Sequence, residues 1–316
     1  MKRNSLPQII VIALVITCLF AILLLGCQSQ PSGEIKVRVI VTQDFGTKLI
    51  LDKATKVNNG SNAMDALQKV ATVETKYGGG FIESINGIHS QYPKVKGDWF
   101  FNVNGMSANV GALDYKLSHG DVEHWDFHDW SFHAFVPAII GDFPQPFSSG
   151  YQGKILPTTI VYDEGFQEAA QNLISTLEKL GVENIHMAGL ESSAYSKKLS
   201  NLILLGTKNF EPISELNENY KKLCFFIRFE NGKIVVYDSQ GNKTQYESGC
   251  GLIQATQNPW NPKGIGVCEN VVWIISGTDK AAVKDAANTL VNHYEELRYA
   301  CGAVIANGEV IKVPVQ

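Results

Sequence analysis

The sequence predicts an α+β protein with two folded domains: a small β-grasp-like domain, in which one helix lies on a mixed sheet, and an α/β domain with a partly parallel sheet. In residues 35–135, short strands of alternating apolar residues surround a single amphipathic helix. In residues 158–316, strands and helices take turns along the chain. Residues 136–157, rich in proline, glycine and serine, are expected to be a loop-rich connector.

The N-terminal segment precedes both domains. Lys2 and Arg3 are followed by an apolar run that ends at Gly26 and Cys27, which is typical of a secretory signal. The tetrapeptide LLGC at 24–27 resembles a bacterial lipobox, and this implies cleavage after residue 26 and attachment of diacylglycerol to Cys27. We therefore expect a signal peptide over 1–26, a polar linker over 27–34, and an extracytoplasmic protein that is lipid-anchored to the cell membrane. An uncleaved signal anchor is the alternative.

The first domain is predicted from its periodicity. Residues 35–42 alternate apolar and polar side chains like a strand, and 48–51 form a short second one. Residues 60–70 have apolar side chains at helical spacing, with Ser61 or Asn62 as the N-cap. Strands are expected over 81–85, 98–103 and 122–128, and Asn104-Gly105 is a strong signal for a hairpin turn.

Several of these segments, taken in order, resemble the transcobalamin-like C-terminal domain family. The matching segments within 35–130 are GSNAMDALQKV, GGGFIESINGI and DWFFNVNGMSANVGALDYKLSHGDVEHWDF. The resemblance implies a β-grasp-like domain that binds a soluble ligand. In transcobalamin and intrinsic factor this domain closes over the corrin ring of cobalamin against an all-helical barrel, which this chain lacks. The resemblance thus implies a corrinoid ligand near the loop 104–113 and the turn 77–80.

Aromatic side chains are dense between residues 99 and 135, where the ligand is expected. A large flat ring needs apolar area and a few polar anchors. The alternative is that some of these rings belong to the core and the others line the contact between the domains. The candidate ligand-binding residues are Trp99, Tyr115, Trp125, Trp130, Asn104 and Asn109.

The last predicted strand of this domain contains a histidine-rich face. His124, Asp126 and His128 share one face of a strand, while Trp125 and Phe127 share the other. The apolar pair suits the core under the helix, so the histidine face should look toward solvent or the second domain. Two histidines and a carboxylate are a recognised ligand set for transition metals. Ligation of corrinoid cobalt and a hydrogen-bonded polar face are the other interpretations, and the unselective spacing favours the last.

The second domain contains an amphipathic helix over 166–180, a buried strand over 201–205, a hairpin around Asn231-Gly232, and a strand–turn–helix unit over 270–297. Its role is open, and forming the other half of the ligand cleft is one interpretation. Outside the cytoplasm, its even number of cysteines predicts disulfides with three alternative connectivities, although buried free thiols would also fit. These residues are Cys224, Cys250, Cys268 and Cys301.

Composition and motifs narrow the function. A net charge of −4 gives no basic surface for nucleic acid. Local catalytic and phosphate-binding motifs such as GxSxG, HExxH and GxxxxGK are absent, so we expect no enzyme. The leading interpretation is a lipoprotein that captures cobalamin or another corrinoid and passes it to a membrane importer, with no other cofactor expected. The alternatives are a cell-envelope attachment protein that binds protein or glycan, and an unrecognised secreted enzyme.

Replacing Cys27 by serine tests the lipid anchor. We expect the variant to remain an unprocessed precursor without lipid, because a hydroxyl group cannot take the place of the thiol that carries the diacylglycerol. Metabolic labelling with a fatty acid and the apparent mass of the product measure this outcome. Labelled fatty acid at the N-terminus of the variant would show that the lipobox interpretation is wrong.

Overall fold

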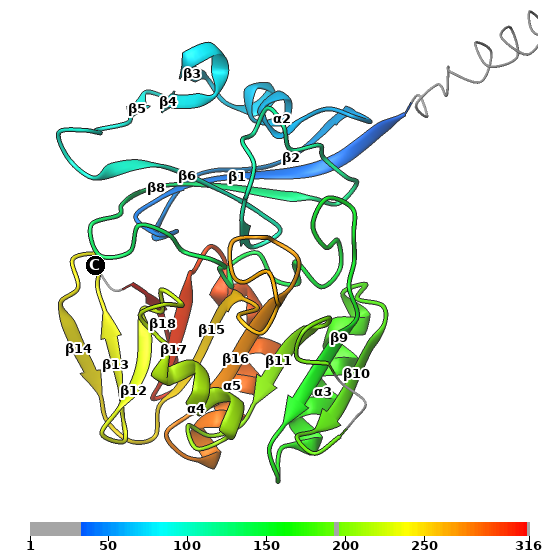
Figure 1. The fold of residues 1–316 in the computed structure, drawn as a ribbon, viewed down its shortest axis with the longest axis vertical. Coiled ribbons are helices and arrows are strands. Elements are labelled where there is room, and N and C mark those ends of the chain that lie inside the picture. The colour runs from blue at the N-terminus through cyan, green and yellow to red at the C-terminus, as the bar shows by residue number, and fades with distance from the viewer. Residues whose placement is uncertain (1–32, 193–195, 315–316) are drawn as a thin grey trace, which may run out of the picture.

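The computed structural model describes residues 33–192 and 196–314, so the predicted signal peptide and Cys27 lie outside the described residues. The described part has the predicted α+β architecture, with two bodies built on separate sheets (Figure 1). Within these residues, no helix combines the length and the apolar character needed to cross a membrane.

The first body contains a five-stranded mixed sheet in the order β2-β1-β8-β6-β7. β1 and β8 run parallel, and the other neighbours run antiparallel. The predicted turn at Asn104-Gly105 joins β6 to β7, and both residues have positive φ angles. The strands are β1 (Glu34–Gln43), β2 (Lys48–Asn58), β6 (Gly97–Val103), β7 (Met106–Ser107) and β8 (Val122–Asp129).

One face of this sheet is covered by the helix α2 (Ala63–Val70), beside a small three-stranded sheet of β3 (Val73–Lys76), β4 (Phe81–Ile85) and β5 (Ile88–His89) (Figure 1). Asn62 is the N-cap of α2: its side chain accepts a hydrogen bond from Asp65 N, and the Asp65 carboxylate accepts one from Asn62 N. Ala63, Met64, Ala66 and Leu67 point into the core, so the predicted helix and its cap are confirmed.

The second body contains a seven-stranded sheet in the order β10-β9-β11-β16-β15-β17-β18. The first four strands run parallel and the last three antiparallel, which confirms a partly parallel sheet. The strands are β9 (Thr158–Tyr162), β10 (Ile185–Gly189), β11 (Asn201–Leu205), β15 (Gly251–Gln257), β16 (Val271–Gly277), β17 (Gly302–Ala306) and β18 (Glu309–Val313).

Both faces of this sheet are covered, which explains why the strands β11 and β16 are mainly apolar. Ile203 and Leu205 belong to the same apolar cluster as the helices α3 (Gln167–Lys179) and α5 (Lys280–Asn292). Leu202 and Leu204 pack with α4 (Glu211–Glu218) and with the strands β12 (Ile227–Glu230), β13 (Lys233–Tyr237) and β14 (Lys243–Tyr246). The predicted helix over 280–297 ends sooner, at Asn292, and a 3-10 turn, η2 (Tyr294–Leu297), follows.

The connector over 136–157 has no helix or strand, as expected, yet it is well packed between the two bodies. Ile140 and Phe147 are fully buried. The connector forms hydrogen bonds with both bodies. Ile139 N donates to Gly105 O in the first body, and Gly141 N donates to Ala300 O in the second, each at a distance of 2.8 Å. The second body therefore covers the face of the five-stranded sheet that is opposite to α2 (Figure 1).

The tip of the β1–β2 hairpin also reaches the second body. Asp44, Phe45 and Gly46 have consecutive positive φ angles of 56°, 57° and 82°. Gly46 packs so closely that a Cβ atom there would lie 1.9 Å from the Tyr299 carbonyl oxygen. Glycine is thus required at position 46 by both its backbone angle and its surroundings.

The predicted disulfides are not formed in this structure, where Cys224, Cys250, Cys268 and Cys301 are free thiols. Cys268 shows one reason: its sulfur donates to Ser107 O at 2.9 Å and lies 3.5 Å from the Gln257 amide nitrogen, so it packs at the contact between the two bodies. The structure thus has the free thiols that were the alternative to disulfides, and a buried thiol such as that of Cys268 serves as a small apolar group.

Replacing Gly46 by alanine is expected to lower the free energy of unfolding by about 3 kcal/mol, since the Cβ atom collides with Tyr299 and the positive φ angle disfavours alanine. Urea denaturation measures this loss. Gly87→Ala is the matched control, because Gly87 has a φ of +79° but no atom within 4 Å of the added carbon. It should lose only about 1 kcal/mol. Equal losses in the two variants would contradict the close contact of the hairpin tip.

Candidate functional site

A cleft of about 250 Å³ opens on the α2 side of the five-stranded sheet. Its walls are the α2 residue Met64, the turn at Gly79–Gly80, the strands β6 and β8, and the loop 107–112. Rings of Phe81, Trp99, Phe101 and Trp125 line it. We call it the aromatic cleft. It lies between the turn 77–80 and the loop 104–113, the two segments near which the family resemblance implies a ligand.

The sequence arranges these rings through strand alternation and local hydrogen bonds. Trp99 and Phe101 are two residues apart on β6, and Trp125 is opposite Phe101 on β8. The Phe101 and Trp125 rings stack with centroids 4.4 Å apart, and Trp99 Nε1 donates to Ile88 O at 3.0 Å. Phe101 and Trp99 are only half-buried, so their faces remain open to the cleft.

Two further apolar residues stand beside the cleft. Tyr77 is 87% exposed and its ring contacts that of Phe81, while Leu113 is 39% exposed and lies against Gly79. Exposed large apolar side chains next to an aromatic cleft enlarge the apolar surface that a ligand would cover.

The other predicted ligand residues have structural positions. Tyr115 and Asn104 are fully buried: the Tyr115 hydroxyl accepts a hydrogen bond from Gln152 N, and the Asn104 amide bonds Asp121, Gly150 and Val122. Asn109 is exposed and donates to Val267 O at 3.1 Å, which ties its loop to the second body. Trp130 packs against Tyr92 and Lys96, outside the cleft.

Two acids near the cleft have shifted acidity. Burial raises the pKa of the Asp98 carboxyl, which lines the cleft. Glu123, on the same face of β8 as Trp125, is fully buried, and burial raises its pKa well above the usual value. Trp125 Nε1 donates to Glu123 Oε2 at 3.2 Å, and Oε1 has no hydrogen-bond partner among the described residues. Glu123 was not predicted as a site residue, although an acid on the apolar face of a strand is a visible signal.

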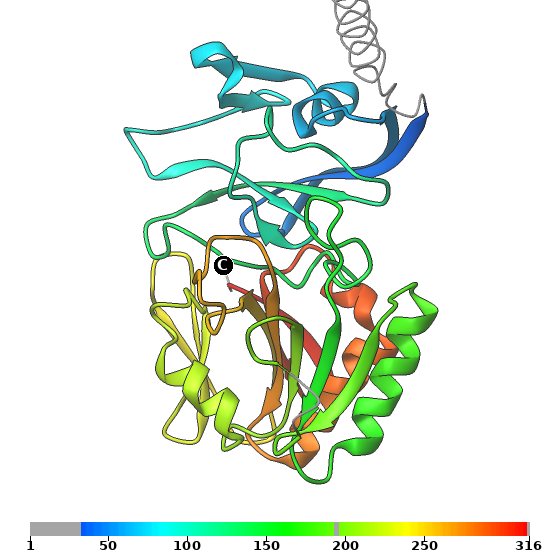
Figure 2. The ribbon, with the colours of Figure 1, turned by 45° about the vertical axis from the view of Figure 1, so that its right-hand side comes forward.

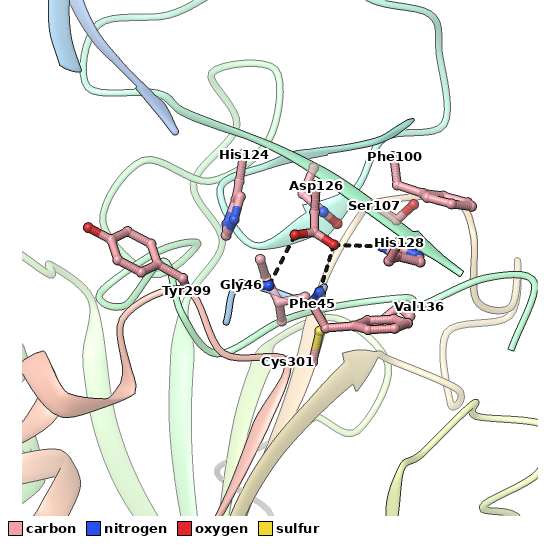
Figure 3. A pocket seen from close by; sticks show the side chains of 12 residues that line it. Phe45, Gly46, Phe100, Ser107, His124, Asp126, His128, Val136, Tyr299 and Cys301 are labelled. Carbon is pink, nitrogen blue, oxygen red and sulfur yellow. Dashed lines mark hydrogen bonds and ion pairs between the residues drawn. The ribbon is translucent and has the colours of Figure 1, made fainter. Parts of the chain in front are cut away.

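The histidine face of β8 points the other way, toward the second body. His124, Asp126 and His128 are nearly inaccessible and surround a small cavity with Phe45, Tyr299 and other residues (Figure 3). This cavity has a volume of only about 20 Å³, which is room for one water molecule. The expectation that this face meets the second domain is therefore confirmed.

The polar atoms of this face are joined in one chain of hydrogen bonds. His124 Nδ1 lies 2.9 Å from Asp142 Oδ1, and His124 Nε2 lies 2.9 Å from Thr42 Oγ1. Thr42 donates to Asp126 Oδ1, and His128 Nδ1 lies 2.7 Å from Asp126 Oδ2. The His128 ring is stacked between two phenylalanines, with centroids 4.0 Å from Phe45 and 4.1 Å from Phe100.

This chain of bonds explains the acidity of its members. Burial alone would lower the pKa of His124, but the charge and hydrogen bond of Asp142 outweigh it and raise the pKa. Burial alone would raise the pKa of Asp126, but the hydrogen bond and charge of His128, with the bond from Thr42, lower it. The result is a buried network in which each of the two acids lies beside a histidine, His124 with Asp142 and His128 with Asp126.

The arrangement favours the hydrogen-bonded interpretation over a metal site. Both nitrogens of His124 and both oxygens of Asp126 already have partners. Among residues 33–192 and 196–314, no three histidine, cysteine or acidic side chains are grouped so that they could hold a metal ion. These histidines also lie across the sheet from the aromatic cleft, so they cannot reach a cobalt ion in it. Asp142 and Thr42, which complete the network, were missed because they come from the connector and from β1.

The family comparison matches part of the first body. The family model described as a domain of unknown function, DUF4430, matches residues 60–129. A solved structure of a Ruminococcus gnavus protein, described as metal-binding, is 15% identical with a TM-score of 0.25, over 30% of this chain and 97% of that one. Haptocorrin in complex with Cbi is 18% identical with a TM-score of 0.25, over 32% of this chain and 27% of that one. No curated protein matches.

His124→Gln tests the charge of the buried network. A raised pKa means that the pair with Asp142 contributes its full stability below the ordinary histidine pKa of about 6.5 and loses it as the pH rises through the higher pKa of the folded protein. We expect the variant to lose about 3 kcal/mol in the free energy of unfolding under mildly acidic conditions, and less under alkaline ones.

Chemical denaturation over a series of pH values measures this difference. His119→Gln is the control, because His119 is exposed and should change stability little at any pH. A loss in His124→Gln that does not depend on pH would mean that His124 is neutral in the folded protein.

Proposed function

We propose that this protein is a binding protein, not an enzyme, and that it holds a flat, largely apolar small molecule in the aromatic cleft. The observation that carries the proposal is the concave group of rings formed by the half-buried Phe81, Trp99 and Phe101 and the buried Trp125. Ligand sites are typically concave and apolar with a few polar groups. Here the polar groups are the Asp98 carboxyl and the backbone of the loop 107–112.

We further propose that the ligand is a corrinoid. The sequence motifs of residues 35–130 resemble the transcobalamin-like family, and the segments that resemble it build the walls of this cleft. A corrin ring is flat and conjugated and carries amide groups around its edge. Its face would lie on Trp99 and Phe101, while its amides would meet Asp98 and the loop backbone.

The size of the cleft defines how the ligand would be held. At about 250 Å³ it covers part of a large ring and leaves the rest accessible. The second body lies across the sheet and contributes no residue to the lining, so the interpretation that it forms the other half of the cleft is wrong. An open site of this kind suits a protein that takes up a ligand and passes it on to a membrane importer.

The proposed location agrees with this role. Diacylglycerol on Cys27 would hold the protein at the outer side of the cell membrane, and the short linker over 27–34 leads directly into β1. The ligand would then be concentrated next to the importer that consumes it.

Equilibrium dialysis against dicyanocobinamide and cyanocobalamin tests the ligand. Burial of apolar ring surface, at roughly 25 cal/mol per Å², should provide most of the affinity before the entropic costs of association. Trp99→Leu should weaken binding by about 2 kcal/mol, which is roughly thirtyfold, because it removes a ring that the ligand covers.

Trp130→Leu is the matched control, since Trp130 lies outside the cleft and its loss should leave the affinity unchanged. Equal affinities of Trp99→Leu and the parent protein would place the site elsewhere. No saturable binding of either compound at millimolar concentration would exclude a corrinoid.

A further inference from the structure

A second groove lies on the outer face of the second body, between α3 and α5, which run side by side (Figure 2). It consists of two adjoining hollows of about 220 and 460 Å³. Asn172, Val291 and Asn292 line both of them, so the groove continues along the two helices. It belongs to neither the aromatic cleft nor the buried histidine network.

The floor of this helix groove is apolar and its walls are polar. Ala169, Ala287 and Val291 form the floor, where small side chains leave the space between the helices open. Asn288 and Asn292 are four residues apart and stand on one wall, contributed by α5. The opposite wall, from α3, presents Asn172 and then hydroxyl groups one turn further on.

The fold does not require these asparagines. Asparagine is a poor former of helix interiors, and alanine at the same positions would favour the helix. Asn172 and Asn288 are exposed, and the Asn172 side chain makes no hydrogen bond within the described residues. On the α5 wall, Asn292 Nδ2 donates a hydrogen bond to Asn288 Oδ1 at 2.7 Å. A row of amides that weakens both helices is typical of a surface that contacts a ligand.

The charged side chains of the helix groove limit the charge that its ligand can carry. Glu168 and Lys284 lie at one end and Lys179 at the other, so these side chains carry a net charge of +1 and the middle is uncharged. A single net positive charge is far fewer than the several basic contacts that hold a polyanion. The half-buried ring of Tyr294 lines the far end and is fixed against Phe143, with centroids 5.4 Å apart. It offers an immobile aromatic face next to the amides.

We infer that the helix groove binds an extended, uncharged oligosaccharide that carries N-acetyl groups. Amide walls match the N–H and C=O groups of acetamides and the hydroxyls of the sugars, because each asparagine both donates and accepts hydrogen bonds. The small apolar floor and Tyr294 match the C–H faces of sugar rings. A straight groove between parallel helices matches the extended form of a β-1,4-linked chain. The site would attach the protein to a glycan while the aromatic cleft stays free.

Titration calorimetry with the full-length protein in detergent tests this inference, with the β-1,4-linked tetramer of N-acetylglucosamine as the probe. We expect saturable binding that weakens about tenfold for each asparagine lost in Asn172→Ala and Asn288→Ala. The thermal stability of both variants should equal or exceed that of the parent protein, since alanine favours the helix. This outcome separates lost contacts from lost folding.

Gln171→Ala is the matched control, because Gln171 is an exposed neighbour on α3 outside the groove, and it should bind as the parent does. The corresponding glucose tetramer should bind more weakly, since it has no acetamide. Absence of binding by the N-acetylated tetramer at millimolar concentration would overturn the inference. Unchanged binding by both asparagine variants would overturn it equally, whatever the result for corrinoids at Trp99.

Discussion

The contact between the two bodies depends on the carboxylate of Asp126. Its two oxygens accept hydrogen bonds from Phe45 N and Gly46 N at 3.0 Å and from Thr42, and one of them pairs with His128. Four groups on one buried carboxylate offset the cost of taking it out of water. They also hold the hairpin tip in its left-handed conformation, and Phe45 then packs into the apolar cluster of the second body. Without this carboxylate, the unfavourable left-handed angles of Asp44 and Phe45 would lose this compensation.

The alternation of side chains along β8 gives the two faces of the five-stranded sheet different surroundings. Trp125 faces the aromatic cleft, while its neighbours His124 and Asp126 face the second body. One strand therefore supplies both a candidate ligand surface and the polar network that fixes the domain contact. Because the second body covers only the histidine side, the cleft is open without any movement between the bodies (Figure 1).

Local patterns in the sequence predicted much of this fold and part of the site. The helix with its Asn62 cap, the apolar strand at 201–205 and the hairpin turn at Asn104-Gly105 depend on neighbours in sequence, and each is present. The two faces of β8 were also predicted, since alternation is a local property. β15 was not predicted, although all seven of its residues are buried. Its glycine and its two glutamines interrupt the apolar pattern that is typical of a buried strand. Gln257 can be buried because its side-chain amide donates to Pro137 O and accepts hydrogen bonds from Gly266 N and Cys268 N at the contact between the two bodies.

Long-range partners were beyond the reach of sequence patterns. Asp142 meets His124 from the connector, and Asn104 is satisfied by Asp121 and by Gly150 O, 46 residues away. The spacing of residues in the sequence does not predict such partners. Asn104 and Tyr115 were therefore predicted to bind a ligand, although both are buried and have structural roles. Disulfides were predicted for a related reason. The number of cysteines can be read from the sequence, but which residues surround each cysteine in the fold cannot.

The exposed edge of the five-stranded sheet affects how two copies of the protein meet. β2 is an edge strand of eleven residues, and a long edge with unpaired backbone groups invites another chain to add to the sheet. Lys48, Lys53 and Lys56 are exposed along it. Their charges repel the same strand of a second copy and make its close approach costly. Pairing of β2 with the same strand of another copy is therefore disfavoured, although the edge of the sheet is exposed.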